Sequence, residues 1–185
     1  LVHDDLNIVL RMIRDLFSED ISLMIIDDPE VHEQTLKFVD RFYQHLSPRI
    51  ALHDGTETIF DSYGVELEIE RALGRRVWLK SGGYIVLDQT EALVSIDVNT
   101  GRFVGKRDPE ETILKTNLEA VREIVYQIRL RNIGGIIILD FIDMEREENK
   151  EKVFETLAQE LKTDRSRTKI LKISEMGLVE MTRKR

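Results

Sequence analysis

The sequence predicts an α/β fold, and two observations support this fold class. Several segments carry apolar residues at helical spacing, as residues 4–19 do with Leu6, Val9, Leu10 and Ile13. Other segments, such as residues 92–97 and 136–140, are short, mostly apolar runs of strand length. In the C-terminal half the two patterns alternate as strand–helix–strand–helix–strand, which is typical of a layered α/β domain.

The N-terminal residues are predicted to form helices that alternate with short strands. Residues 4–19 form an amphipathic helix, and residues 22–26 form a strand that ends at Asp27 and Asp28. Pro29 suits the first turn of a second helix, which runs to about residue 43 with Asp28 as its cap. A further strand over residues 49–53 and a helix over residues 60–73, ended by Gly74, complete this region.

The pattern changes at Arg75, so we place a boundary near Gly74, which separates residues 1–74 from residues 75–185. Residues 76–80 and 84–88 alternate around Gly82-Gly83, which predicts a β-hairpin. The later elements follow in this order: strand 92–97, loop 99–108, helix 109–131, strand 136–140, helix 147–162, and strands 169–173 and 178–182.

Composition limits the functions that the chain can have. Of 185 residues, 42% are hydrophobic, yet no apolar run approaches the roughly 20 residues that span a bilayer, so we expect no membrane insertion. Cysteine is absent, which excludes disulfides and thiolate metal sites within these residues and fits a cytoplasmic setting. The net charge of −8 argues against wrapping nucleic acid by bulk positive charge. Binding a polyanion would require a local basic patch or a metal ion.

Two predicted strands end in a carboxylate, Asp97 and Asp140, and a long helix joins them. A strand–helix–strand crossover makes the two strands parallel, so both side chains emerge at the same edge of the sheet. Carboxylates on adjacent strands, about 4.8 Å apart, repel each other unless a proton or a cation lies between them. Magnesium or manganese is the cation expected for oxygen ligands, and Asn99 could add a neutral ligand.

Such an ion would let a polyanion approach an acidic protein and would favour phosphodiester hydrolysis. Arg102, Lys106 and Arg107 follow Asp97 in a loop and could assist. The same residues also have purely structural interpretations. An aspartate at a strand end often caps a helix, as Asp143 is expected to do for the next one, and Trp78 is expected to be a core residue. Spacing alone therefore predicts an α/β domain with a candidate metal site and no particular reaction.

Three stretches resemble the ribonuclease E/G family of bacterial endoribonucleases: SGGYIVLDQTEALVSIDVNTG at 81–101, ETILKTNLEAVREIVYQIRLRNIGGIIILDFIDM at 111–144, and GLVEMTRKR at 177–185. The resemblance covers nearly all of the chain from Arg75 onward, and it is closer to the ribonuclease G branch. It implies that residues 1–74 belong to an RNase H-like subdomain, and that residues 75–185 are a DNase I-like layered α/β subdomain that holds the active site.

The resemblance also implies the roles of individual residues. Asp97 and Asp140 match the two aspartates that hold catalytic magnesium, and Asn99 matches the asparagine that supports them. Arg167 matches a basic residue that helps to recognise the 5′-monophosphate of the RNA. Family members cut single-stranded RNA internally, leave a 5′-phosphate and a 3′-hydroxyl, and act in RNA decay and rRNA maturation. The implied mechanism is attack of a metal-activated water on phosphorus, with the 3′ oxygen leaving.

Some domains of the family architecture are not in these residues. The OB-fold RNA-binding domain and most of the 5′-sensor precede the matching segment, so we expect weak RNA binding and slow or absent cleavage by this chain alone. The family's zinc-binding cysteines follow it, so the zinc-mediated homodimer contact cannot form here, although a homodimer through other exposed surfaces is an alternative. Two further alternatives are a metal-dependent phosphohydrolase with Asp97 as nucleophile, and a catalytically silent scaffold.

Overall fold

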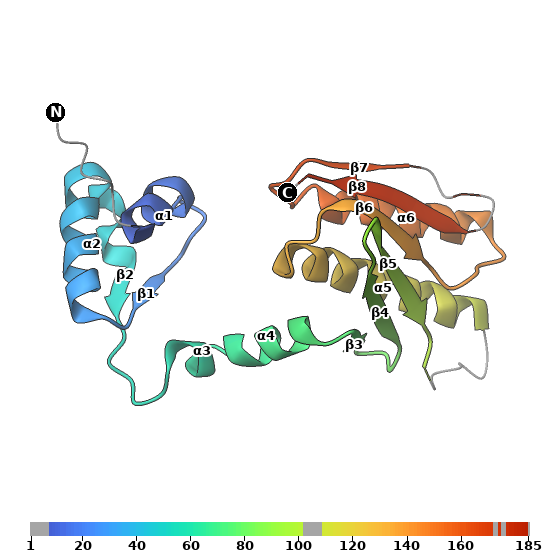
Figure 1. The fold of residues 1–185 in the computed structure, drawn as a ribbon, viewed down its shortest axis with the longest axis horizontal. Helices are drawn as coiled ribbons and strands as arrows, with labels where there is room; N and C mark the ends of the chain where they lie inside the picture. The colour runs from blue at the N-terminus through green and yellow to red at the C-terminus, as the bar shows by residue number, and fades with distance from the viewer. Residues whose placement is uncertain (1–7, 102–108, 172–173, 175–176, 185) are drawn as a thin grey trace. The chain divides into compact units, whose positions relative to one another are not determined.

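The computed structural model describes residues 8–101, 109–171, 174 and 177–184, and it has the predicted α/β class (Figure 1). The chain divides into two compact units, Leu1–Leu67 and Glu68–Arg185, where the sequence had suggested a boundary between residues 74 and 75. The end of helix α4 (Val65–Leu73) belongs to the second unit. Its Glu68 carboxylate accepts a hydrogen bond from Tyr126, and its Arg71 carbonyl accepts one from Arg131.

The first unit consists of short elements around a two-stranded parallel sheet. In chain order they are α1 (Ile8–Leu16), β1 (Met24–Ile26), α2 (Pro29–Phe42), the 3-10 helix η1 (Gln44–Arg49), β2 (Ile50–Leu52) and α3 (Ile59–Ser62). The predicted cap of α2 is confirmed, because the Asp28 carboxylate accepts from the Val31 N–H at 2.9 Å. The single helix predicted over residues 60–73 is wrong: Gly64, at φ +66°, separates α3 from α4.

The second unit contains a six-stranded mixed sheet in the order β3-β4-β5-β6-β8-β7. Its strands are β3 (Arg76–Trp78), β4 (Tyr84–Gln89), β5 (Leu93–Asn99), β6 (Gly135–Asp140), β7 (Thr168–Ile170) and β8 (Leu178–Arg183). The helices α5 (Pro109–Leu130) and α6 (Glu147–Leu161) follow β5 and β6. The predicted hairpin is confirmed as the antiparallel pair β3–β4, and the predicted crossover makes β5 and β6 parallel.

This unit has two layers, with α5 and α6 packed against one face of the sheet (Figure 1). Every second residue of the central strands is buried against these helices, including Ile85, Ile96 and Leu139, and the intervening residues face away from the helices. The alternation leaves the opposite face of the sheet without a covering helix in the described part of this unit. That open face carries the side chains of Asp97 and Asp140.

Candidate functional site

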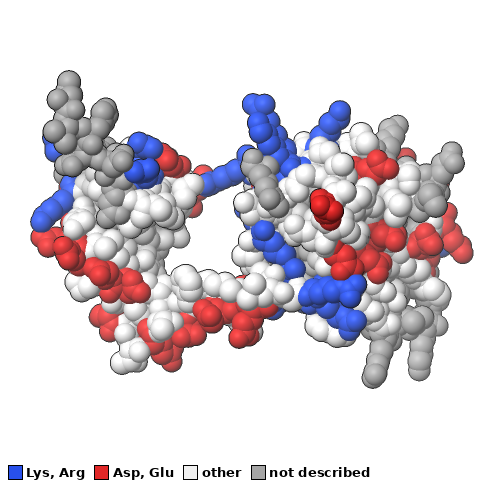
Figure 2. Space-filling view, viewed as in Figure 1, with Lys and Arg blue, Asp and Glu red and all other residues white. Residues whose placement is uncertain are grey.

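The structure places Asp97 and Asp140 directly opposite each other. They are register partners at the ends of the parallel strands β5 and β6, and both side chains lie on the open face of the sheet. Neighbouring strands are about 4.8 Å apart, so the two carboxylates share one small region of solvent. Figure 2 shows acidic side chains gathered around the end of the sheet where these strands terminate.

The electrostatics of the pair identify an uncompensated concentration of negative charge. Partial burial raises the pKa of the Asp140 carboxyl, and the nearby charges of Asp97 and Asp143 raise it further. All three effects disfavour the ionised form, and a cation placed between the carboxylates would reverse the last two. Within the described residues no ion pair involves Asp97 or Asp140, so a compensating cation would have to come from outside these residues.

The donor set fits a hard divalent cation, magnesium or manganese, better than it fits a softer metal such as zinc. No group of three or more His, Cys, Asp or Glu suited to a metal ion occurs among the residues that the structure describes. Magnesium does not need such a cage, because it keeps several waters and is bound by one or two carboxylates together with substrate phosphates. Two adjacent carboxylates on an open face meet that requirement.

Asn99, the candidate supporting residue, lies beside the pair. Its side-chain amide donates to the Asp97 carboxylate at 2.7 Å, two residues along the same face of β5. This bond fixes the orientation of Asp97 and leaves its second carboxylate oxygen for another partner.

Two glycines allow the segment Asn99-Thr100-Gly101, where β5 ends, to lie close to the turn Ser81-Gly82-Gly83. A β-carbon on Gly101, which has φ +64°, would lie 2.3 Å from the Gly82 carbonyl oxygen, and one on Gly83 would lie 2.7 Å from the Asn99 carbonyl oxygen. The backbone of the turn therefore lies against the backbone that follows Asp97. Only glycine permits this approach, and it fixes the position of Asn99.

Helix α5 holds the segment that follows Asp140. The Asn117 side chain is fully buried, donates to the Ile142 carbonyl at 2.8 Å and accepts from the Ile142 N–H at 3.1 Å. A buried amide that satisfies both backbone groups of one residue acts like a strand partner. It sets the path of the chain from Asp140 to Asp143.

The same helix binds the other two segments near the pair. The Glu110 carboxylate accepts from the N–H groups of Glu145 and Arg146 at the start of α6 and from the Asn149 amide. The Asn149 bond is the largest cause of a lowered pKa of Glu110, and the two backbone bonds add to it. The Glu119 carboxylate accepts from the N–H groups of Lys80 and Ser81 in the β3–β4 turn.

The predicted cap at Asp143 is therefore wrong. The N-cap residue of α6 is Arg146, whose side chain forms no capping hydrogen bond, and Glu110 supplies the acceptor instead. Asp143 lies near Asp140 and close to Gly177, where an added β-carbon would be 3.4 Å from the Asp143 carboxylate. Sequence analysis missed Glu110, Asn117 and Glu119. A polar residue, Asn117, within the apolar stripe of a long helix was the available signal.

Arg167 is not brought together with the aspartates. It is exposed, and it precedes β7, where its carbonyl accepts from the Lys184 N–H. Its neighbour Thr168 pairs with Arg183, which pairs with Gly135 at the opposite end of β6 from Asp140. Arg167 is separated from the carboxylate pair by about five residues along the strand direction and by two strand spacings, from β6 to β7. Together these separations amount to about 20 Å. The basic loop residues Arg102, Lys106 and Arg107 lie outside the described residues.

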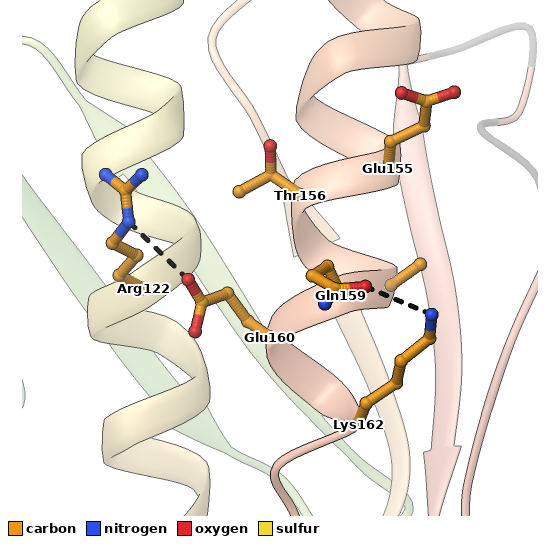
Figure 3. A pocket seen from close by; sticks show the side chains of 7 residues that line it. Arg122, Glu155, Thr156, Gln159, Glu160 and Lys162 are labelled. Atoms are coloured by element: carbon orange, nitrogen blue, oxygen red, sulfur yellow. Dashed lines mark hydrogen bonds and ion pairs between the residues drawn. The ribbon is translucent and has the colours of Figure 1, made fainter.

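A groove between α5 and α6 lies on the helical layer, away from the open face of the sheet (Figure 3). Its volume is about 630 Å³, and the Arg122 guanidinium lies 3.5 Å from the Glu160 carboxylate across it. The two side chains form an ion pair that joins the helices across the groove. The groove does not include either aspartate.

In the described residues, no helix is both long enough and apolar enough to cross a bilayer.

Comparison with known proteins identifies the chain's relatives. It is 46% identical over 95% of its length to ribonuclease G of Haemophilus influenzae, and 44% identical over its full length to ribonuclease G of Escherichia coli. It is 42% identical over its full length to the chloroplastic ribonuclease E/G-like protein of Arabidopsis thaliana.

The chain spans 36%, 38% and 19% of these three relatives, so it corresponds to only a portion of each. All of it, residues 1–185, matches the sequence profile of one family. The resemblance seen in the motifs around Asp97 and Asp140 is thereby confirmed, and the chain belongs to the Ribonuclease E/G family.

Proposed function

We propose that this chain carries the catalytic site of a magnesium-dependent endoribonuclease that cleaves single-stranded RNA. The observation that carries the proposal is the register pair Asp97–Asp140 on the open face of the sheet, with a raised pKa at Asp140 and no cationic side chain paired to either within the described residues. The relatives' names, ribonuclease G and ribonuclease E/G-like protein, supply the substrate class.

Each site residue has a role that follows from its position. Asp97 and Asp140 hold the divalent cation, magnesium or manganese, and Asn99 orients Asp97 through its 2.7 Å hydrogen bond. The bound cation supplies Lewis-acid polarisation of a phosphoryl oxygen and increases the acidity of water. To Arg167, about 20 Å away by strand geometry, we assign the binding of the RNA 5′-phosphate, on the basis of the family resemblance.

The reaction is hydrolysis of an internal phosphodiester. A water oxygen forms a bond to phosphorus, the bond from phosphorus to the 3′ oxygen breaks, and a proton is transferred to that oxygen. The products are a 5′-phosphate and a 3′-hydroxyl, as expected for roles in RNA decay and rRNA processing. On the same resemblance we assign residues 1–74 to part of the family's RNase H-like subdomain and residues 75–185 to its DNase I-like subdomain.

Calorimetry and cleavage of one RNA test the proposal together. Magnesium and manganese are titrated into the chain and into Asp97→Asn, Asp140→Asn and the exposed control Glu91→Gln. The same proteins are then incubated with a 5′-monophosphorylated A/U-rich single-stranded RNA, with cation or chelator, and the product ends are mapped.

The expected result is cation binding and slow cleavage by the native chain and Glu91→Gln, both lost in the two aspartate variants. Removing one of two ligands from a hard-cation site should reduce affinity at least about tenfold. Cleavage that continues in chelator, or cation binding unchanged in Asp97→Asn and Asp140→Asn, would refute the proposal.

A further inference from the structure

An aromatic pair occupies the open face of the sheet beside the carboxylates. Trp78, expected from the sequence to be a core residue, is 59% exposed. Its ring packs edge-on to the ring of Tyr84, with a centroid distance of 5.2 Å and an interplanar angle of 64°. The core expectation failed because Trp78 alternates with buried Val77 on β3, and alternation directs it to the open face.

Sheet register connects this pair to the candidate catalytic residues. Trp78 pairs with Tyr84, and Tyr84 pairs with Asn99. Side chains of directly paired residues project from the same face, so the three form one row across β3, β4 and β5. The adjacent row contains Asp97 and Asp140. Two strand spacings, about 10 Å, separate the strand of Tyr84 from that of Asp140.

Arg76 adds a cation to the same surface. Its guanidinium carbon lies 4.5 Å from the ring centroid of Tyr84 and 5.8 Å from that of Trp78. In the described part of the chain Arg76 forms no ion pair, whereas its neighbour Arg75 is paired with Asp88. Arg76 therefore keeps its charge available on the face that holds the aromatic rings.

We propose that Trp78, Tyr84 and Arg76 form a binding platform for a nucleobase and its phosphate, next to the cleaved bond of a single-stranded RNA. This inference rests on the proposed function, from which it takes the substrate class. Unstacked bases bind aromatic faces and guanidinium planes, and such contacts tolerate any sequence because every base has a π-face. Arg76 also gives the platform a positive charge, which attracts phosphate on a protein whose net charge is −8.

The chain's composition provides a direct probe, because Trp78 is its only tryptophan. A short single-stranded RNA is titrated in chelator, where the proposed cleavage cannot proceed, and again with magnesium at matched ionic strength. Tryptophan fluorescence reports contact at Trp78, and the anisotropy of labelled RNA gives the dissociation constant. An oligonucleotide of equal length with abasic sites keeps the phosphates and removes the bases.

The variants are Trp78→Leu and Tyr84→Leu, with Phe60→Leu as the matched control. Phe60 is also an exposed aromatic residue, at 51%, and lies in α3 rather than on the sheet. Stacking contributions of about 1–3 kcal/mol per base correspond to a weakening of about 5- to 150-fold in the dissociation constant. We expect that loss in both platform variants, an unchanged constant in Phe60→Leu, and quenching of Trp78 by RNA but not by the abasic strand.

Equal affinity of Trp78→Leu, Tyr84→Leu and the native chain would overturn the platform, as would equal quenching by the abasic strand. Circular dichroism melting identifies a variant that has not folded. If Trp78→Leu does not fold, the dissociation constant of Tyr84→Leu and the quenching of Trp78 fluorescence in the native chain decide whether the platform binds RNA. The two proposals fail separately: base-dependent quenching without magnesium-dependent cleavage supports the platform alone, and cleavage with unaffected platform variants supports only the proposed function.

Discussion

At the scale of single residues, the position of Asp140 costs stability when no cation is present, because partial burial and the nearby charges of Asp97 and Asp143 all disfavour its ionised form. The pKa of Asp140 is raised above its ordinary value of 3.8, so the folded state binds more protons than the unfolded state just above that pH. Stability therefore falls as pH rises through the interval between the unfolded and the folded pKa, and the penalty is fully present once the pH exceeds the folded pKa. This is the behaviour of a site that needs a positive charge.

Neutralising Asp140 should consequently stabilise the metal-free chain. In chelator at pH 7, Asp140→Asn should raise the melting temperature by about 1–2 °C, a small gain because both carboxylates face water. With magnesium at about ten times the dissociation constant, the native chain should gain about 1.4 kcal/mol, and the variant, whose affinity should be at least about tenfold weaker, should gain at most about 0.4 kcal/mol. Differential scanning calorimetry at pH 5 and 7 measures both effects.

Glu91→Gln is the control for removing a charge elsewhere on the surface, and it should respond to magnesium like the native chain. A variant Asp140→Asn that is less stable than the native chain in chelator would contradict the electrostatic account. A magnesium response kept in that variant would place the cation elsewhere.

Gly101 tests whether close backbone contact positions the site. Gly101→Ala introduces a β-carbon 2.3 Å from the Gly82 carbonyl oxygen, whereas Gly64→Ala has a similar positive φ with nothing within 4 Å. In the control Gly64→Ala, the free energy of unfolding should fall by only about 1–2 kcal/mol, the cost of holding an alanine in the left-handed region. Gly101→Ala should lose more and should also weaken magnesium binding, because Asn99 must move. Equal losses of unfolding free energy in Gly101→Ala and Gly64→Ala, measured by urea denaturation, would show that the turn accommodates the added carbon.

At the scale of elements, helix α5 determines the geometry of the loops around the carboxylates. Asn117→Leu removes two hydrogen bonds and leaves the partly buried N–H and carbonyl of Ile142 without their partner. The expected cost is about 2–4 kcal/mol, together with reduced magnesium binding. Arg122→Leu on the same helix breaks only an exposed ion pair of 3.5 Å and should change stability by less than about 1 kcal/mol. Similar effects of the two substitutions, measured by denaturant titration, would contradict this role for α5.

How far the sequence predicts the structure also differs between elements. Hydrophobic periodicity located the strands of Asp97 and Asp140 and the crossover between them, because both follow from local alternation and chain connectivity. The same periodicity extended one helix over residues 60–73, because apolar spacing does not register the left-handed turn at Gly64. Asn117 and Trp78 escaped prediction for another reason. Their roles depend on which residue of another strand or loop lies opposite, and a single sequence does not contain that register.

At the scale of the whole molecule, the two compact units have separate cores of unequal size. Among the described residues, the core of Glu68–Arg185 contains 22 buried apolar side chains and that of Leu1–Leu67 contains five. The stability of a unit increases with the apolar area that it buries, so the smaller core should unfold first. The candidate catalytic residues all lie in the unit with the larger core.

Two core truncations should therefore act on different thermal transitions. Val39→Ala, in the smaller core, should lower only the first transition, and Ile96→Ala, beside Asp97 in the larger core, should lower only the second. Both residues are fully buried, so each truncation should cost about 2–4 kcal/mol in its own unit. Calorimetry with and without magnesium measures both, and magnesium should raise the second transition alone. A single transition that both variants lower equally would mean that the units unfold as one cooperative body, and magnesium binding at β5 and β6 would then stabilise the whole chain.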